Sequence, residues 1–413
     1  MTITNPLWHE ITECRLCACK KLDTILDLGD QPPANSLTKS KDNEETKIPL
    51  RLLRCAECST VQLSATVDPA YLFSHYVWVT GTSRTAIEYS KTFSEKVIKY
   101  VPKNNPFVLE IASNDGTFLK CFKEKGCKVL GIDPAQNIAE IATNAGIETW
   151  PEFFNEEVAT KVLSKVGRPD VAIARNVLPH VKQIDSIAKG LCDLVGKDGT
   201  IVVEFHYAGP IVDELHYDSI YHEHLFYFSL KTMGSVFQKY GFSIYDLFRS
   251  PISGGSLVVF LSSENKPQTS DLEKALLKES DSNLNELETW KSFGEKSKEH
   301  ADQLRSMIQT RLSDGKCVAY GASARSSTML NFAEIDCNYL AYVIDKNPWK
   351  QGLFTPGTRI PIVGFDEGLQ GLSSGDSLIL LAWNFEKEIV DEVRRAGFEG
   401  QILVPLPERI RVI

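Results

Sequence analysis

The stretch "FVLEIASNDGTFLKCFKEKG", residues 107–126, decides the fold. Apolar strand formers come first, a turn with Asn114, Asp115 and Gly116 follows, and an amphipathic helical pattern begins at once. Similar apolar runs recur downstream, each separated by a helical pattern: "KVLGID" (128–133), "DVAIAR" (170–175) and "TIVVEF" (200–205). Alternation of apolar strands with helices is typical of a parallel sheet covered on both faces. We therefore expect an α/β protein with a Rossmann-like sheet.

The turn after the first strand predicts a cofactor site. In open parallel sheets, ligands bind beyond the carboxyl ends of the strands. The next strand ends in Asp133, and an acid at this position can accept both hydroxyls of an adenosine ribose. The GxGxxG pattern that lets a pyrophosphate approach the backbone is absent. Asp115 repels a pyrophosphate but suits the ammonium and sulfonium of S-adenosylmethionine, so we expect this methyl donor rather than NAD. The alternative is a turn whose aspartate is satisfied internally.

Two CxxC pairs near the N-terminus predict a zinc site. Cys14 and Cys17 form the first pair, Cys55 and Cys58 form the second, and 37 residues lie between Cys17 and Cys55. Each pair can offer two thiolates to one Zn²⁺ ion, and four thiolates leave no open coordination position. We therefore expect a structural metal and treat Cys19 as a bystander. Four unrelated buried thiols are the alternative.

Length and charge set the organisation of the chain. Its 413 residues carry a net charge of −9, which argues against binding to the phosphate backbone of nucleic acid. No secretory signal or run of about 18 apolar residues is present, so we expect a cytoplasmic protein with no membrane partner. A monomer is one possible state, and the residues do not give the oligomeric state. Four segments are expected: a zinc-binding domain (1–66), the central domain (67–262), a helical connector (263–314) and a smaller Rossmann-like α/β domain (315–413).

A second stretch, "DSIYHEHLFYFS" (218–229), concentrates ionisable groups among aromatics. A surface loop does not need the aromatics, and a core segment does not tolerate unpaired charges. Metal binding is disfavoured because the two histidines are only two positions apart. In an extended segment Tyr221 and Glu223 would face away from His222 and His224. A turn is therefore required to bring Tyr221, Glu223 and His224 together.

With these pieces in place, the sequence resembles the sugar C-methyltransferases that act on nucleotide-linked keto-deoxysugars. The matching motifs cover essentially the whole chain: the double CxxC, "LEIASNDGTFL", "GIDPAQNIAEIA", "RNVLPHV", "EFHYAG", "DSIYHEHLFYFSL", "GGSLVVF", "GASARSSTMLNF", "IDKNPWKQGLFTPGTRIPI" and "LAWNF". The sequence departs from the family pattern at three positions. It has Arg175 where the family usually has a smaller or amide residue, Ser253 where histidine is common, and Arg325 where lysine is frequent. These departures bear on the sugar and nucleotide preference.

The resemblance implies a class I methyltransferase domain that transfers a methyl group to C3 of a 4-keto sugar through an enolate. His224 would be the base, Tyr221 a donor to the developing oxyanion, and Glu223 a group that orients a histidine or binds a hydroxyl. Tyr76 and His180 would line the same cavity, and His222 would be structural. The implied cofactor contacts are Glu110, Ala112, Asn114, Asp115, Gly116, Asp133, Pro134 and Asn176.

The C-terminal segment is expected to hold the nucleotide. "VAYGASARSSTML" (318–330) leads from a strand into a helix, where free N–H groups favour a phosphate and Arg325 can form a forked pair with it. Lys350 and Gln351 follow the next strand, and Trp383 and Asn384 can stack on and hydrogen-bond a base. The alternative is a Rossmann unit that only packs.

Other classes stay open on the sequence alone. An NAD-dependent oxidoreductase is disfavoured by the missing glycine pattern, and a zinc-ribbon adaptor by the acidic balance and the Tyr221–His224 cluster. An O- or N-methyltransferase would need no strong carbon-acid base. The sugar, its nucleotide base and the stereochemistry of methylation are not readable from the residues.

Overall fold

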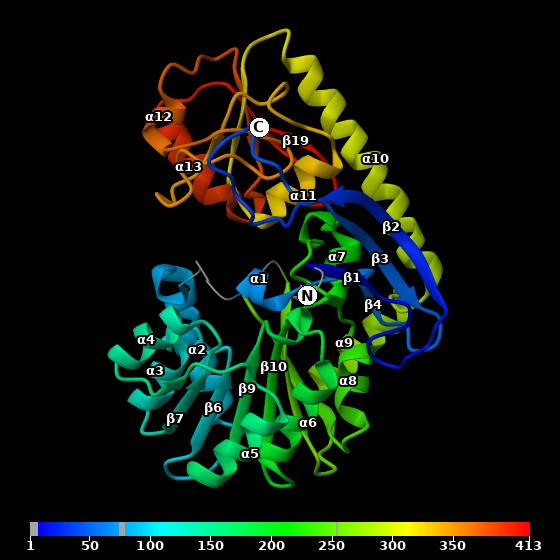
Figure 1. The fold of residues 1–413 in the computed structure, drawn as a ribbon, viewed down its shortest axis with the longest axis vertical. Coiled ribbons are helices and arrows are strands. Elements are labelled where there is room, and N and C mark those ends of the chain that lie inside the picture. Colours follow the sequence, from blue (N-terminus) through cyan, green and yellow to red (C-terminus); the bar gives the residue numbers. More distant parts are fainter. Residues whose placement is uncertain (1–6, 74–78, 253–254) are drawn as a thin grey trace, which may run out of the picture.

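A computed structural model describes residues 7–73, 79–252 and 255–413, drawn in Figure 1. The central domain forms the lower half of that view, and the C-terminal domain forms the upper half. The N-terminal strands and the long helix α10 lie along one side, where they connect the two halves. Tyr76 and Ser253 lie outside the described residues.

The central domain is built on a seven-stranded sheet of order β12-β13-β10-β9-β6-β7-β8. All neighbours pair in parallel except β13, which is antiparallel to both β10 and β12. Chain order reverses between β6 and β9, so their carboxyl ends define the switch point where ligands bind. The strands are β6 (Phe107–Ile111), β7 (Lys128–Ile132), β8 (Thr149–Trp150), β9 (Val171–Arg175), β10 (Thr200–His206), β12 (Ser243–Arg249) and β13 (Ser256–Ser262).

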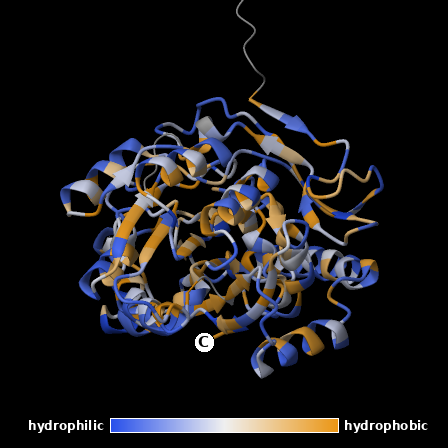
Figure 2. Ribbon diagram, turned by 90° about the horizontal axis from the view of Figure 1, so that it is seen from below, coloured by the Kyte–Doolittle hydropathy of each residue, from blue (hydrophilic) through white to orange (hydrophobic). Residues whose placement is uncertain are grey.

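Helices cover both faces of this sheet because its strands are apolar on both sides. Every residue of β6 is buried, as expected for a central parallel strand. Figure 2 shows the hydrophobic strands enclosed by helices whose outer faces are hydrophilic. The helices are α2 (Arg84–Ile98), α3 (Thr117–Glu124), α4 (Gln136–Asn144), α5 (Glu156–Lys165), α6 (Ile184–Val195), α7 (Ala208–Asp213) and α8 (Leu230–Gln238). Ser229 caps α8 by accepting from the Thr232 N–H.

The N-terminal domain borrows a strand from the central segment. Its antiparallel sheet has the order β11-β4-β3-β2, and β11 (Phe226–Tyr227) directly follows the Tyr221–His224 cluster. The remaining elements are β1 (Trp8–Glu10), β2 (Leu22–Gln31), β3 (Ile48–Cys55), β4 (Val61–Leu63), β5 (Ala65–Val67) and α1 (Pro69–Phe73). This pairing ties the expected zinc domain to the expected catalytic segment.

The C-terminal domain is a second, smaller Rossmann-like unit, reached through α9 (Ser270–Asp281) and α10 (Leu287–Arg311). Its six-stranded sheet has the order β16-β15-β14-β17-β18-β19 and is parallel except for β19. The elements are β14 (Cys317–Tyr320), α11 (Ala324–Phe332), β15 (Val343–Ile344), β16 (Ile362–Val363), α12 (Phe365–Leu369), β17 (Ser377–Leu380), α13 (Glu386–Arg395), β18 (Gln401–Val404) and β19 (Arg411–Val412). Within the described residues, no helix combines the length and apolar character that crossing a membrane requires.

Candidate active site

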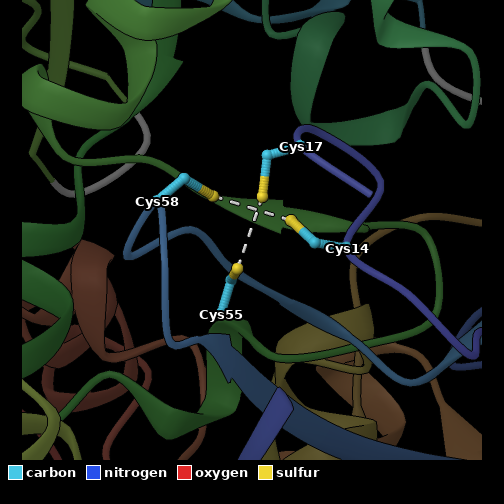
Figure 3. A group of neighbouring side chains, drawn as sticks. All are labelled: Cys14, Cys17, Cys55 and Cys58. Carbon is cyan, nitrogen blue, oxygen red and sulfur yellow. Dashed lines mark hydrogen bonds between the residues drawn. The ribbon is translucent and has the colours of Figure 1, made fainter. Parts of the chain in front are cut away.

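The four predicted metal ligands come together at the edge of the N-terminal sheet. Their Sγ atoms all lie within 4.8 Å of one another and point at a common centre (Figure 3). The pairs Cys14–Cys58 and Cys17–Cys55 are separated by 3.6 and 3.5 Å, close to the roughly 3.8 Å edge of a tetrahedral zinc–thiolate site. The side chain of Gln62 donates to the Cys14 sulfur at 3.1 Å, a bond that stabilises a thiolate. The cluster fits a structural Zn²⁺.

A cavity of about 1040 Å³ opens at the switch point of the central sheet. It is large enough for a cofactor and a sugar together. The lining includes five predicted cofactor residues: Ala112, Asn114, Asp133, Pro134 and Asn176. Asp133 is buried, and its carboxylate accepts the backbone N–H groups of Asn114 and Ala135 at 2.9 and 3.0 Å. A carboxylate has about four acceptor positions, so capacity remains for the ribose hydroxyls.

The backbone at the mouth of β6 and β9 is strained where the cofactor is expected. Ala112, Asn114 and Asn176 have φ of 48°, 52° and 52°, in the left-handed region, which asparagine adopts more readily than other residues with a Cβ and which is uncommon for alanine. All three line the cavity. Such strain concentrates at ligand sites, where it positions backbone groups. The residues present therefore fit S-adenosylmethionine at this turn.

The other predicted cofactor residues are used inside the protein. Asp115 accepts from the Thr117 N–H at 3.2 Å and hydroxyl at 2.7 Å, and from the Gly81 N–H at 2.8 Å. It therefore fixes the first residue of α3 and holds the preceding loop, as in the internally satisfied alternative. Gly116 adopts φ 76° as the N-terminal cap of the same helix. Neither residue lines the cavity.

Glu110 belongs to a buried ion cluster beneath the cavity. The Arg175 guanidinium contacts Glu110 at 2.7 Å and Glu204 at 3.5 Å, and both carboxylates are fully buried. The guanidinium also lies over the Phe118 ring, 3.1 Å from its centre. Burial raises the pKa of both Glu110 and Glu204, and the pairing with Arg175 opposes that rise. Arg175 lines the cavity, so this cluster forms its charged floor.

His224 sits on the cavity in a defined tautomer. Its Nδ1 lies 2.9 Å from the Ser219 carbonyl, which can only accept, so Nδ1 carries the hydrogen of the neutral ring. Its Nε2 then accepts from the Tyr221 hydroxyl at 2.9 Å. Burial lowers the pKa of His224 well below its ordinary value, and His180 and Arg325 add to the effect. The imidazole is therefore neutral near pH 7, the form that a base requires.

The required turn is present in residues 221–224. The His224 N–H donates to the Tyr221 carbonyl at 2.9 Å, which brings both side chains onto the cavity. His180 lines the same cavity, with its ring centre 4.9 Å from that of His224, and its Nδ1 contacts the Glu223 carbonyl at 2.7 Å. The Glu223 side chain turns away and accepts from Asn35 at 2.6 Å.

His222 is structural in this arrangement. Its ring is buried, and Nε2 lies 3.1 Å from the Ile48 carbonyl of β3. The segment is thereby fixed to the N-terminal sheet.

Only two of the five residues predicted to bind the nucleotide sugar line the cavity. Arg325 and Asn384 line it, but Lys350, Gln351 and Trp383 do not. Arg325 forms a forked pair with the fully buried Asp218, at 3.0 and 2.8 Å, and Trp383 donates to the same carboxylate at 2.8 Å. The predicted phosphate fork is therefore directed at Asp218.

Lys350 and Gln351, the two remaining predicted residues, form hydrogen bonds within the C-terminal domain. The Lys350 ammonium donates to the Ala322 carbonyl at 2.7 Å and lies 3.4 Å from Asp345. The Gln351 amide donates to the Asp345 carbonyl at 3.1 Å.

Sequence reasoning assigned no role to Asp218, Glu204 and His206. Asp218 joins the central and C-terminal domains through Arg325, and Glu204 shares Arg175 with Glu110. His206 lines the cavity at the end of β10. One signal was available: Glu204 and His206 stand at the carboxyl end of a predicted parallel strand, where ligands bind. The partner of Asp218 lies 107 residues away, so no local pattern indicates it.

This sheet, with its cofactor cavity at the switch point and a four-cysteine zinc cluster beside it, defines an S-adenosylmethionine-dependent methyltransferase with a zinc-binding domain. Family models match in the same order: a zinc-binding domain over residues 14–73, a methyltransferase domain over 86–247 and a C-methyltransferase C-terminal domain over 251–407. The chain is 29% identical over 408 residues to the C-methyltransferase NovU of Streptomyces niveus, covering 96% of each chain. The chain thus carries the zinc-binding, methyltransferase and C-methyltransferase C-terminal domains in this order, is similar to this C-methyltransferase over almost its whole length, and is an enzyme.

Solved methyltransferase structures resemble parts of the chain more distantly. The magnesium protoporphyrin IX methyltransferase of Synechocystis, with bound S-adenosylmethionine, is 12% identical with a TM-score of 0.33, covering 43% of this chain and 79% of its own. An S-adenosylmethionine-dependent methyltransferase of Anabaena variabilis is 16% identical with a TM-score of 0.35, covering 43% and 84%. At these TM-scores, the similarity to solved structures supports neither the fold nor the activity of this chain.

Proposed function

We propose that this C-methyltransferase transfers a methyl group to C3 of a nucleotide-linked 4-keto-deoxysugar, with His224 as the base that generates the enolate. One observation carries the proposal: a neutral imidazole with an acceptor Nε2 lies on the same cavity as the cofactor turn. The resemblance to sugar C-methyltransferases supports the choice of substrate.

Carbon–carbon bond formation requires a carbon nucleophile. The 4-keto group acidifies the C3–H bond, so that a positioned base can remove the proton and leave an enolate. When bound, S-adenosylmethionine supplies an electrophilic methyl group on a sulfonium. Apolar and aromatic side chains such as Ile111, Phe118 and Phe154 form part of the cavity wall, and such surfaces limit the water that could reprotonate an enolate.

The observed hydrogen bonds suggest a path for the proton. A hydroxyl oxygen can accept a proton while it donates its own, and the hydroxyl hydrogen of Tyr221 points at His224 Nε2. As the C3–H bond breaks, its proton passes to this oxygen and the hydroxyl hydrogen passes to His224. The resulting imidazolium keeps its Nδ1–H on the Ser219 carbonyl. Tyr221 thus acts here as a relay rather than as a direct donor to the enolate oxygen.

The domain arrangement supports a nucleotide substrate. Arg325 and Asn384, both from the C-terminal domain, line the cavity together with His224 of the central domain. A nucleotide held at the C-terminal side would place its sugar toward the base.

Two measurements test the proposal. The purified enzyme is incubated with S-adenosylmethionine and a panel of nucleotide-linked 4-keto-deoxysugars, and a product heavier by one CH₂ group is expected by mass spectrometry. In D₂O, deuterium should enter C3 in the presence of the wild-type enzyme. His224→Asn should lose both reactions while still binding S-adenosylmethionine, and His9→Asn, at an exposed histidine, should lose neither. Methylation of oxygen or nitrogen without C3 exchange would overturn the proposal.

A further inference from the structure

The proposed reaction develops negative charge on the C4 oxygen, and the groups beside the base are already used. Tyr221 donates its hydroxyl hydrogen to His224, and His224 donates Nδ1–H to a carbonyl. His180 directs Nδ1 at the Glu223 carbonyl, which leaves Nε2 of its neutral ring as an acceptor. An enolate oxygen needs a donor, and none of these three rings has a further N–H or O–H to offer in the neutral state.

His206 meets the requirement that these groups do not. It ends β10 and lines the cavity, and its imidazole forms no hydrogen bond with any described residue, although its backbone pairs with Ser256 of β13. Its Nε2 is inaccessible to solvent and has no partner. A neutral imidazole carries one N–H in either tautomer. Because Nε2 has no accessible surface, the ring nitrogen that a ligand in the cavity can reach is Nδ1, which has no hydrogen-bond partner among the described residues either. An imidazole whose two nitrogens are both unpaired beside a cavity indicates that a ligand completes it.

We infer that His206 is a further catalytic residue, which donates an N–H to the ketone oxygen of the substrate as the enolate forms. This inference rests on the proposed function. As the C3–H bond breaks and its proton passes to the base, the electron pair forms the C3–C4 double bond, and the carbonyl π electrons move onto the oxygen. His206 keeps its proton throughout. When the C3–C4 electron pair captures the methyl group, the S–CH₃ bond would break with its electrons staying on sulfur as a neutral thioether, and the oxygen would return to a ketone.

The surroundings of His206 suit this role. Burial lowers its pKa well below the ordinary value, and Arg325, His224 and His216 add to the lowering. The ring therefore remains neutral and serves as a donor without competing for the proton. The positive charge of Arg325, close enough to oppose protonation of His206, also favours the developing negative charge.

Kinetics of three variants test the inference. In His206→Leu, kcat and C3 deuterium exchange should both fall by about 10²–10³-fold, with S-adenosylmethionine affinity and the KM of the keto-sugar changed less than about threefold. His206→Gln retains an N–H donor and should recover at least about tenfold of that loss. The control His300→Gln removes another buried imidazole, outside the cavity, and should leave kcat of the folded enzyme unchanged.

A second measurement does not depend on turnover. With a ¹³C-labelled ketone bound to the inactive His224→Asn variant, the C=O stretching frequency should be lower than in His224→Asn/His206→Leu, because a hydrogen bond polarises the carbonyl. Equal frequencies, or a His206→Leu enzyme that is only less thermostable with wild-type kcat, would overturn the role of His206. Absence of C3 exchange in the wild-type enzyme would instead overturn the proposed function.

Discussion

At the scale of single residues, the proposed mechanism depends on a histidine that stays neutral. Burial lowers the pKa of His224 and of His180, so protonation of either ring requires a pH below the ordinary value of about 6.5. The active, neutral form is therefore retained as the pH falls from 8 through 6.5. We expect kcat/KM to stay flat over that range, with the acid limb at lower pH. The profile should be measured for the C3 exchange reaction, and an acid limb centred at 6.5 would contradict it.

Arg175 is the residue whose loss should damage the fold most. It is the cation that faces the fully buried Glu110 and Glu204, so Arg175→Met leaves two carboxylates without compensation. Removing one partner from a buried ion cluster destabilises by about 3–5 kcal/mol. Urea unfolding should show this loss, and adding Glu110→Gln should restore part of it. The exposed Arg84→Met should change stability by less than about 0.5 kcal/mol.

Residue types were predictable where chemistry requires them, but their partners were not. The sequence indicated a base in residues 221–224 and an acid at position 133, and both lie on one cavity. It did not show that Tyr221 would face His224 Nε2, or that Asp115 would be used to fix the first residue of α3. Both outcomes depend on rotamers and on neighbours outside the local pattern.

At the scale of elements, the zinc cluster is coupled to the catalytic segment. Cys55 ends β3 and Cys58 precedes β4, and β4 pairs with β11 immediately after His224. His222 contacts the Ile48 carbonyl of β3. The metal therefore stabilises the N-terminal sheet, to which the segment 221–224 is attached by the β11–β4 pairing and the contact of His222 with Ile48. The cofactor turn, in contrast, belongs to β6 and β7.

Loss of zinc should therefore affect the base before the cofactor site. We expect Cys58→Ser to lose zinc and to slow C3 exchange by at least about tenfold, with S-adenosylmethionine affinity changed only a few-fold. Elemental analysis, calorimetry and deuterium exchange measure the three quantities. Cys19→Ser, a cysteine outside the cluster, should retain zinc and exchange. A zinc-free enzyme with full exchange would show that the coupling is absent.

The elements themselves were largely predictable, because each local signal agreed with the fold. The apolar strand patterns, the Ser229 cap and the CxxC pairs all act within a few residues. The pairing of β11 with β4 was not predictable, since it joins segments more than 160 residues apart and adds only two residues to the sheet. Short strands carry too little sequence pattern to identify a partner.

At the scale of the whole molecule, the three domains meet around groups that are buried only in the folded chain. Asp218, with no exposed surface, accepts from Arg325 and Trp383 of the C-terminal domain. His222 is buried between the central segment and the N-terminal sheet. All seven described histidines have a pKa below the ordinary value, with burial as the main cause. Folding is thus linked to pH through the interfaces between domains.

The sign of this linkage follows from which state binds protons. Burial lowers the pKa of His222 to about 4, whereas the unfolded ring titrates near 6.5. Between these values the unfolded chain binds the additional proton, so stability falls as the pH falls. The contribution of His222 from pH 7 to pH 5 is about 2 kcal/mol. Buried carboxyls with a raised pKa, such as Glu110 and Glu204, have the opposite sign, because the folded state binds their protons.

Comparing the wild type with a His222 variant separates the contribution of this histidine to the pH dependence of stability from that of the buried carboxyls. The free energy of unfolding is measured in urea at pH 7 and pH 5 for the wild type and for His222→Gln. The variant is less stable at pH 7, because it loses a packed ring and its bond to Ile48, but its decrease between the two pH values should be smaller by about 2 kcal/mol. Lys298→Gln, at an exposed site that is not a histidine, should reproduce the wild-type decrease. Equal decreases in all three proteins would mean that His222 is already protonated, or already accessible to solvent, in the native state.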